Sequence, residues 1–197
     1  MFASVSAIVL CSVALAAEPA KAKIDSEAWP VVGGSDFKLA ADLVARGEKD
    51  DKGVLHLANN TLLSVRLKAE KDCDVAVYWV DPKGQVVQLF PNRFDRANRL
   101  KAGEERVIPA PNKDYELVAV PTVGTGFDRL HIVAVTGNLP ALPKGEVQGP
   151  FIAFRSESDR KDVIRAVRGV VVREKPSPGV KGDVQVAQAE LKFRVQP

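Results

Sequence analysis

The stretch DCDVAVYWVDPKGQVVQLF, residues 72–90, carries the strongest signal for the fold. From Cys73 to Val80 the residues alternate in direction with the period of two that is typical of a β-strand, and both faces are mostly apolar. The segment 81–84, Asp-Pro-Lys-Gly, follows, with proline and glycine at the second and fourth positions of a type I turn. Residues 85–90 are therefore predicted to return as the partner strand of a hairpin.

Similar short strand patterns occur on both sides of this hairpin, separated by stretches rich in turn-forming residues. The predicted strands are residues 53–57, 63–67, 106–108, 116–120, 130–135 and 184–195. In the last of them the alternation slips near Ala187 and Ala189, which predicts a β-bulge. Short strands at this spacing predict a mainly β fold, an antiparallel β-sandwich that is immunoglobulin-like or barrel-like, with one or two flanking helices.

Two segments have the apolar spacing of a helix. Residues 36–46, DFKLAADLVAR, are predicted as a first helix that Ser35 caps and Gly47 ends. Ser156 begins the second segment, in which Val163, Ile164, Val167 and Val170 form an apolar stripe before Gly169 ends the helix. The opposite face of this second helix carries Lys161, Arg165 and Arg168.

The first residues of the chain predict export. The segment is uncharged and apolar as far as Ala17, and Ala14-Leu15-Ala16 fits the small-residue pattern of a signal-peptide cleavage site. We therefore predict a signal peptide at residues 1–16, an N-terminal extension at 17–34 and a single β-sandwich domain at 35–197. The expected location is periplasmic or extracellular, with no transmembrane segment after cleavage. Retention of the apolar segment as a membrane anchor is the alternative.

Composition and motifs argue against several classes of function. The net charge of +3 is too small to indicate nucleic-acid binding. The two histidines, His56 and His131, have no Cys, Asp or Glu at metal-binding spacing, so neither a metal site nor another cofactor is expected. Cys73, the only cysteine after cleavage, lies between Asp72 and Asp74 in a strand pattern, which indicates a structural residue rather than a nucleophile. No catalytic constellation is present, and we expect no enzymatic activity.

A basic stretch follows the hairpin. Pro91 cannot donate to a strand ladder, so pairing is predicted to stop near Phe90, and Asn92 is predicted to close the turn through its own backbone. Beyond this turn lie the candidate binding residues Arg93, Phe94, Arg96 and Arg99. Arginine beside an aromatic ring on a loop is frequent at interfaces. The alternative is that Phe94 closes the open end of the sandwich while the arginines remain solvated.

The order of these pieces resembles a bacterial family of exported domains of unknown function, over about residues 63–140. The pieces that carry the resemblance are Cys73 to Trp79, Asp81 to Gly84, Leu89 to Asn92, Ala102 to Glu104, Ile108-Pro109, and the turn from Gly124 to Phe127. Members of this family occur alone or beside caspase-like peptidases, protein kinases or repeat modules. The resemblance implies a mainly β, non-catalytic accessory domain, and it implies no catalytic residue.

Three hypotheses of function follow. The first is a non-catalytic exported accessory or binding domain whose partner is a protein or another cell-envelope component. The second is an envelope protein that binds a polyanion or a glycan through Arg93, Arg96, Arg99 and the basic helix face. The third, an enzyme, has no group of residues to support it.

Overall fold

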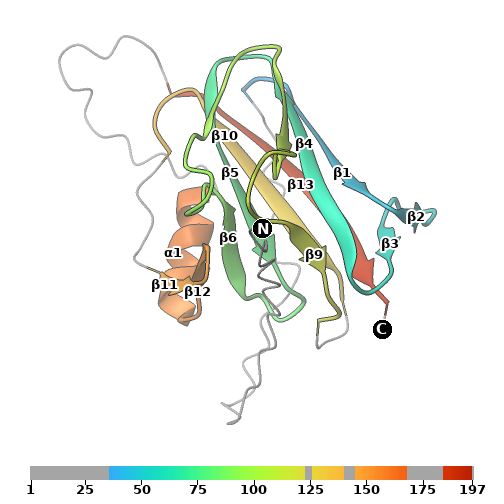
Figure 1. Cartoon of the computed structure of the whole chain (residues 1–197). Coiled ribbons are helices and arrows are strands. Elements are labelled where there is room, and N and C mark those ends of the chain that lie inside the picture. Colours follow the sequence, from blue (N-terminus) through green and yellow to red (C-terminus); the bar gives the residue numbers. More distant parts are fainter. Residues whose placement is uncertain (1–35, 123–125, 140–144, 168–183, 197) are drawn as a thin grey trace, which may run out of the picture.

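The computed structural model describes residues 36–122, 126–139, 145–167 and 184–196, with the side chains of 164–167 excepted (Figure 1). The described strands are β1 (Leu39–Ala45), β2 (Gly47–Lys49), β3 (Leu55–Leu57), β4 (Thr61–Ala69), β5 (Cys73–Val80), β6 (Val86–Phe90), β7 (Arg99–Leu100), β8 (Glu105–Ile108), β9 (Leu117–Ala119), β10 (Asp128–Val135), β11 (Glu146–Gln148), β12 (Phe151–Phe154) and β13 (Val186–Val195). One helix, α1 (Glu157–Val167), accompanies them in these ranges. The prediction of a mainly β fold is confirmed.

The predicted hairpin of residues 72–90 lies within the larger of two sheets. Strand β5 pairs with β6 on one side and with β10 on the other, in the order β11-β12-β6-β5-β10-β13-β3-β2. The Asp81 carboxylate holds the turn, because its Oδ1 accepts hydrogen bonds from the backbone N–H groups of Lys83 and Gln85 at 2.9 and 2.7 Å. Gly84 has φ 78°, a conformation that glycine adopts at no steric cost.

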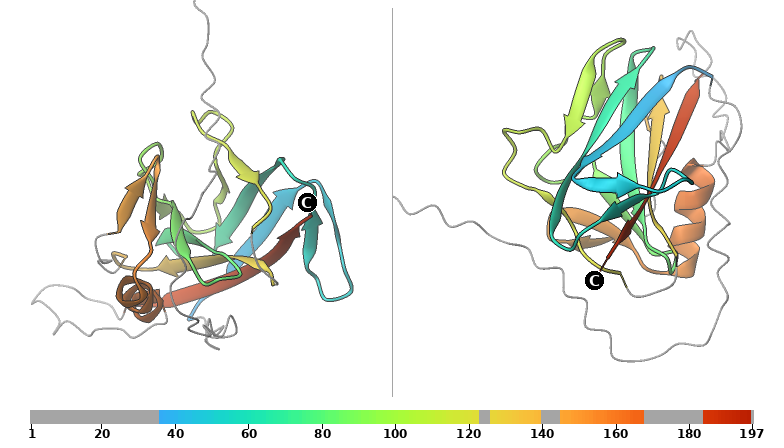
Figure 2. Two further views of the ribbon diagram at one scale, coloured as in Figure 1. Left: turned by 90° about the horizontal axis from the view of Figure 1, so that it is seen from below. Right: turned by 90° about the vertical axis from the view of Figure 1, so that its right-hand side faces the viewer.

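The smaller sheet contains β1, β4 and β8 in that order, with β9 also paired to β4. Side chains from the two sheets meet in one large apolar cluster, which includes Leu57, Val65 and Leu67 with Phe90 and Ile132. Figure 2 shows the two layers from two directions. The predicted packing of sheets is therefore confirmed, and the described strands do not close into a barrel.

Helix α1 covers the face of the larger sheet that points away from the smaller one (Figure 2). Val163 packs there in a second apolar cluster with Ala76, Tyr78 and Val133. This explains why both faces of β5 are apolar in the sequence, since one face lies in the sandwich and the other lies under α1. Ser156 caps the helix as predicted, its Oγ accepting the Asp159 N–H at 3.0 Å. No helix in the described ranges is long and apolar enough to cross a membrane.

The prediction of a helix over residues 36–46 is wrong. Residues 39–45 form β1, which pairs antiparallel with β4 along its whole length. Its small apolar residues also fit an alternating pattern, and Leu39, Ala41 and Leu43 pack against the core between the sheets. A helix this short is marginal by itself, so tertiary pairing decides the conformation. Gly47 does not end a helix; a Cβ atom there would collide with the His56 carbonyl oxygen of the neighbouring strand.

The bulge predicted in the last strand is also absent. Strand β13 keeps a continuous register with β10, from Val186 opposite Val135 to Phe193 opposite Asp128. The alternation slips because Val186 packs into the cluster under α1, whereas Ala187 and Ala189 face the sandwich. The register shift of the larger sheet lies instead between Val77 and Tyr78, where β5 pairs with β6. One pair departs from the predicted antiparallel arrangement, since β3 runs parallel to β13.

Candidate functional site

The loop after β6 begins with the predicted turn at Asn92. Strand β6 ends at Phe90, and Asn92 Oδ1 accepts hydrogen bonds from the N–H groups of Phe94 and Asp95 at 2.8 and 2.9 Å. Its Nδ2 donates to the Leu89 carbonyl oxygen at 2.7 Å. The side chain therefore replaces missing strand hydrogen bonds and sets the direction in which the next residues leave the sheet.

Asp95 anchors this loop to the smaller sheet. Its side chain is only 1% exposed and accepts hydrogen bonds from Arg106 Nη2 at 3.1 and 3.2 Å. Lys113 Nζ lies 3.3 Å from the same carboxylate. The Arg106 guanidinium also lies 4.6 Å from the centre of the Phe90 ring. The one acidic residue among the arginines of this stretch is thus its buried structural anchor.

Phe94 continues a row of aromatic rings from the interior to the surface. It stacks on Tyr115 at 5.7 Å between ring centres, and Tyr115 meets Phe151 edge-on at 6.4 Å. The Arg93 guanidinium lies 5.0 Å from the centre of the Phe94 ring. Phe94 remains 39% exposed, so it combines a contact with the core and a surface that a partner can reach. Burial raises the pKa of the Tyr115 hydroxyl, which keeps it neutral at ordinary pH.

The structure brings only some of the other predicted site residues together. Arg96 is exposed in the same loop. Arg99 lies in β7 and forms ion pairs with Asp74 at 3.3 Å and with Asp72 at 3.9 Å, which attach it to β5. The basic helix face lies on the layer behind the larger sheet, where Lys161 forms an ion pair with Glu157 at 2.6 Å. Arg165 belongs to α1, but its side chain lies outside the described residues, as does Arg168.

The outer face of the smaller sheet has an apolar end that sequence reasoning missed. The register places Val44 opposite Ser64, and Leu62 opposite Val118, so all four side chains share this face. Leu62 is 55% exposed, and Val44, Val118 and Val120 are exposed as well. We call Val44, Leu62, Val118 and Val120 the apolar end of the sheet. A contiguous exposed apolar surface of this kind marks an interaction site in soluble proteins.

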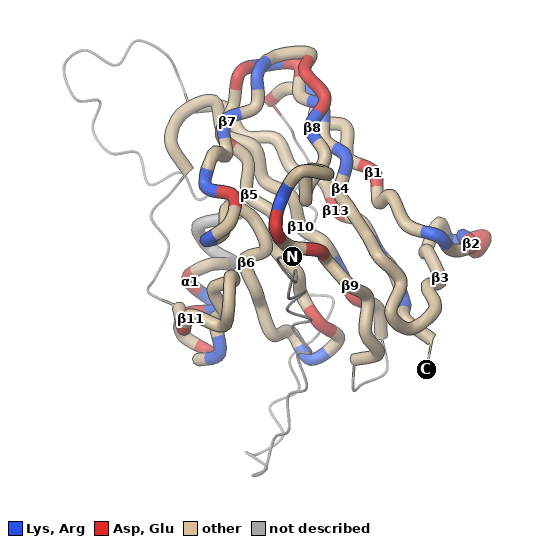
Figure 3. The backbone as a smooth tube through the Cα atoms, viewed as in Figure 1, with Lys and Arg blue, Asp and Glu red and all other residues tan. Residues whose placement is uncertain are grey.

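The opposite end of the same face is charged. Arg66, Lys68 and Glu105 lie there, and Arg66 forms an ion pair with Glu105 at 3.4 Å. Figure 3 shows charged residues gathered in this direction, around the turns that lead into β7 and β8. The exposed apolar residues are thus confined to one end of this face, where their contact with water is unfavourable.

A groove of about 640 Å³ opens beside the apolar end. Val44 and Leu62 line it, together with Pro109, Pro111 and Tyr115 from the loop between β8 and β9. Tyr115 lines the groove and stacks on Phe94, which Arg93 contacts in turn, so the basic loop adjoins the groove. This surface, the groove with the apolar end and the Arg93–Phe94 pair, is the candidate site.

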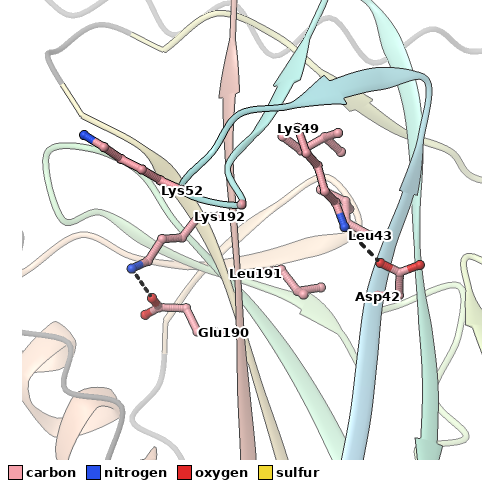
Figure 4. A pocket seen from close by; sticks show the side chains of 9 residues that line it. Asp42, Leu43, Lys49, Lys52, Glu190, Leu191 and Lys192 are labelled. Carbon is pink, nitrogen blue, oxygen red and sulfur yellow. Dashed lines mark ion pairs between the residues drawn. The ribbon is translucent and has the colours of Figure 1, made fainter.

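A second cavity, of about 360 Å³, lies at the seam between β1 and β13 (Figure 4). Four of its five charged residues form two pairs, since Lys192 lies 3.3 Å from Glu190 and Lys49 lies 3.8 Å from Asp42, and the fifth is Lys52. The groove is the candidate site because the exposed apolar residues Val44 and Leu62 line it, whereas neither is in the lining of this cavity. In the described part of the chain no three His, Cys, Asp or Glu side chains come together as metal ligands.

Cys73 is buried in the core cluster, as its strand pattern predicted. Burial raises the pKa of its thiol to about 11, and the carboxylates of Asp74 and Asp72 act in the same direction while Arg99 opposes them. The thiol therefore stays protonated at neutral pH and is a poor nucleophile.

We expect replacement of Cys73 by alanine to lower the free energy of unfolding by about 1 kcal/mol, because it removes one small buried side chain. Partner binding should not change. In the native protein, labelling of Cys73 by a thiol reagent at pH 8 should be no faster than global unfolding. Labelling within seconds would contradict the structural role.

The sequence contained a signal for the residues that were missed. Leu62 directly precedes the predicted strand 63–67. In an extended strand it points to the same side as the polar residues Ser64 and Arg66. Val118 is likewise outward-facing in β9. An apolar residue at an outward position is ordinary when it stands alone, and only the strand pairing brings these residues together.

Part of this chain is similar to a known family. No curated protein and no solved structure matches it. Residues 56–135 match a family described as Domain of unknown function (DUF4384). The match runs from β3 to β10 and includes the hairpin of residues 72–90, the basic loop and the loop between β8 and β9 that lines the groove. Residues 56–135 of this chain are therefore similar to a domain of unknown function, and the match covers less than half of the chain.

Proposed function

We propose that this protein is an exported, non-catalytic binding domain that attaches to another protein of the cell envelope. The observation that carries the proposal is the apolar end of the smaller sheet, where Val44, Leu62, Val118 and Val120 are exposed together beside the groove. Burying such a surface against a partner releases the water that covers it, and this is the main driving force of protein association.

The aromatic loop adds the features of a binding hot spot. Phe94 is held by Tyr115 behind it and by the Arg93 guanidinium, so little conformational freedom is lost when a partner covers it. Arginine and aromatic residues are enriched among the residues that dominate binding energy. Asp95 and Asn92 fix the loop backbone on which both side chains stand.

Binding of a polyanion or a glycan is the alternative. Arg93 and Arg96 are exposed and available for such a ligand, whereas Arg99 and Lys161 already have acidic partners at short distance. The contacts of Arg99 and Lys161 weaken this alternative, and the aliphatic lining of the groove favours a polypeptide.

The proposal is tested with a tagged full-length chain that is produced in its source cells and recovered from the envelope fraction. We expect a reproducible protein partner to be captured with it. Leu62→Asp and Phe94→Ala should each weaken this capture about tenfold or more, because each removes an exposed contact residue. Neither change should lower the melting temperature much.

Val147→Asp is the matched control. Val147 is 77% exposed on β11, in the other sheet, so its replacement introduces the same charge away from the site. Capture that is equally strong with Leu62→Asp and with the control would refute the binding face. Capture of polyanions or glycans instead of protein, with loss on Arg93 and Arg96 replacement, would favour the alternative.

A further inference from the structure

We propose that the groove binds a short segment of the partner protein that carries apolar residues between acidic residues. The inference rests on the proposed function and adds the chemistry of the partner. It follows from the charged groups in and beside the groove and from the kinds of side chain that line it.

Most cations near the candidate site have acidic partners. Arg106 and Lys113 bind Asp95, and Arg66 binds Glu105. Arg46, which lines the groove at the end of β1, has no ion pair with a described residue, and neither has Arg93 in the basic loop. Two guanidinium groups are therefore available at the site, one from Arg46, directly after β1, and one from Arg93 in the loop.

Only one acidic residue, Glu116, belongs to the lining of the groove. The lining also contains Arg46 and Lys113, of which Lys113 shares Asp95 with Arg106, and Arg93 lies in the adjoining loop. The net charge of these groups is positive, which attracts carboxylates and opposes basic segments. Guanidinium groups bind carboxylates with two parallel hydrogen bonds, which lysine does not do. The free groups at this site therefore match acidic side chains of a partner.

The lining between these charges is aliphatic. Val44, Leu62, Pro109 and Pro111 offer no hydrogen-bond donor from their side chains, and apart from the Ser64 hydroxyl this part of the lining favours an apolar middle of the ligand. A sugar ring generally stacks on a free aromatic face, whereas the aromatic rings of this site are already contacted by other side chains. Tyr115 is only 9% exposed, and Phe94 is contacted by Tyr115 and Arg93. The ligand class that satisfies both conditions is an acidic and apolar polypeptide segment.

The probe for this inference is a fluorescein-labelled peptide, Gly-Glu-Val-Leu-Val-Glu-Gly, with two variants in which glutamine or lysine replaces both glutamates. Fluorescence anisotropy with the full chain at low salt measures their dissociation constants. We expect the glutamate peptide to bind about tenfold more tightly than the glutamine peptide, and the lysine peptide to bind most weakly. The advantage of the glutamate peptide should shrink as salt is added.

Arg46→Glu and Arg93→Glu test the two guanidinium groups. Each should weaken binding of the glutamate peptide about tenfold and leave the glutamine peptide unchanged, and the double variant should prefer the lysine peptide. Lys68→Glu is the matched control, because Lys68 is exposed at the charged end of the same sheet face and should have no effect.

Equal binding of the glutamate and glutamine peptides, or no binding of either, would overturn the inference. It would also fall if Arg46→Glu and Arg93→Glu had no more effect than Lys68→Glu. These results would not refute the proposed function. That function is tested separately by capture of the envelope partner, which depends on Leu62 and Phe94. Loss of capture in Leu62→Asp together with silent arginine variants would support the binding face and reject the acidic segment.

Discussion

Replacement of Asp95 by alanine should lower the free energy of unfolding by about 3 kcal/mol. The carboxylate is 1% exposed and is bound by both Arg106 and Lys113, so its removal leaves two cations without their shared partner. This value is at the lower end of the stability loss expected when a buried ion pair is broken, because Arg106 and Lys113 keep some of their hydration. Urea denaturation followed by tryptophan fluorescence measures the change.

The change should also reach the candidate site. Without Asp95 the loop loses its attachment to β8 and to the loop after it, so Arg93 and Phe94 lose their fixed positions. Partner binding should weaken even where the protein remains folded. Asp95→Asn should cost about half as much, because the amide oxygen still accepts a hydrogen bond from Arg106.

Asp114→Ala is the control for the loss of one acidic side chain. Asp114 follows Lys113 directly in the chain but is exposed, so we expect a change within about 0.5 kcal/mol. If Asp95→Ala were as mild as this control, the carboxylate would not be the anchor of the loop.

The second large effect concerns pH and arises from two buried groups in β10. Burial raises the pKa of Asp128 to about 6, although the Trp79 indole N–H and the Thr122 hydroxyl donate to it at 2.9 and 3.1 Å. Burial lowers the pKa of His131 to about 3. Asp128 and His131 therefore depart from their ordinary pKa values in opposite directions.

These shifts act oppositely on stability. Between about pH 4 and 6 the folded protein holds a proton on Asp128 that the unfolded chain has released, so this group stabilises the fold as pH falls. Between about pH 3 and 6.5 the unfolded chain holds a proton on the histidine that folded His131 lacks, so this group destabilises the fold as pH falls. Each contributes at most about 1.4 kcal/mol per pH unit, so the two nearly cancel between pH 4 and 6.

Asp128→Asn should therefore raise the free energy of unfolding at pH 7 by about 1–2 kcal/mol, since the amide keeps the acceptor for Trp79 and carries no charge. Its advantage over the wild type should shrink as pH falls from 6 to 4 and disappear below about pH 4, where both wild-type states bind the proton. Urea titrations at pH 7, 6, 5 and 4 measure this difference.

His131→Gln should give the opposite trend. Whatever its stability at pH 7, this variant should gain relative to the wild type as pH falls from 6.5 to 4, by up to about 3 kcal/mol. The double variant should lack both trends. Stability curves that run parallel to the wild type for both single variants would contradict the assignment of the pH dependence to these residues.

Much of the fold could be predicted because its signals are local. The hairpin of residues 72–90 has strand alternation, a turn with proline and glycine, and a proline that ends the second strand, all within one stretch. The Asn92 turn and the Ser156 helix cap depend on side chains that bond backbone groups two or three residues away. Such interactions need no distant partner, so the sequence specifies them directly.

Where several patterns fit the same residues, the sequence did not determine the structure. Leu39, Ala41 and Leu43 satisfy a strand as well as a helix, and the pairing of β1 with β4 selects the strand. The alternation of β13 is interrupted at Val186 only under the assumption that one face of the larger sheet is exposed to solvent. In the structure α1 covers that face, and Val186 packs into the cluster beneath it. In both cases the deciding contact comes from a distant part of the chain. Packing against that part buries apolar surface, which favours the observed conformation.

The sequence by itself determined the β-rich composition, the hairpin, the helix cap and a basic loop with one aromatic residue. The tertiary structure decided what the loop does, because it buries Asp95 between Arg106 and Lys113 and stacks Phe94 on Tyr115. It also decided the candidate site, because strand register places Leu62 beside Val118 on one face. A binding surface depends on which outward residues of separate strands become neighbours, and this information lies in the pairing of strands rather than in any single segment.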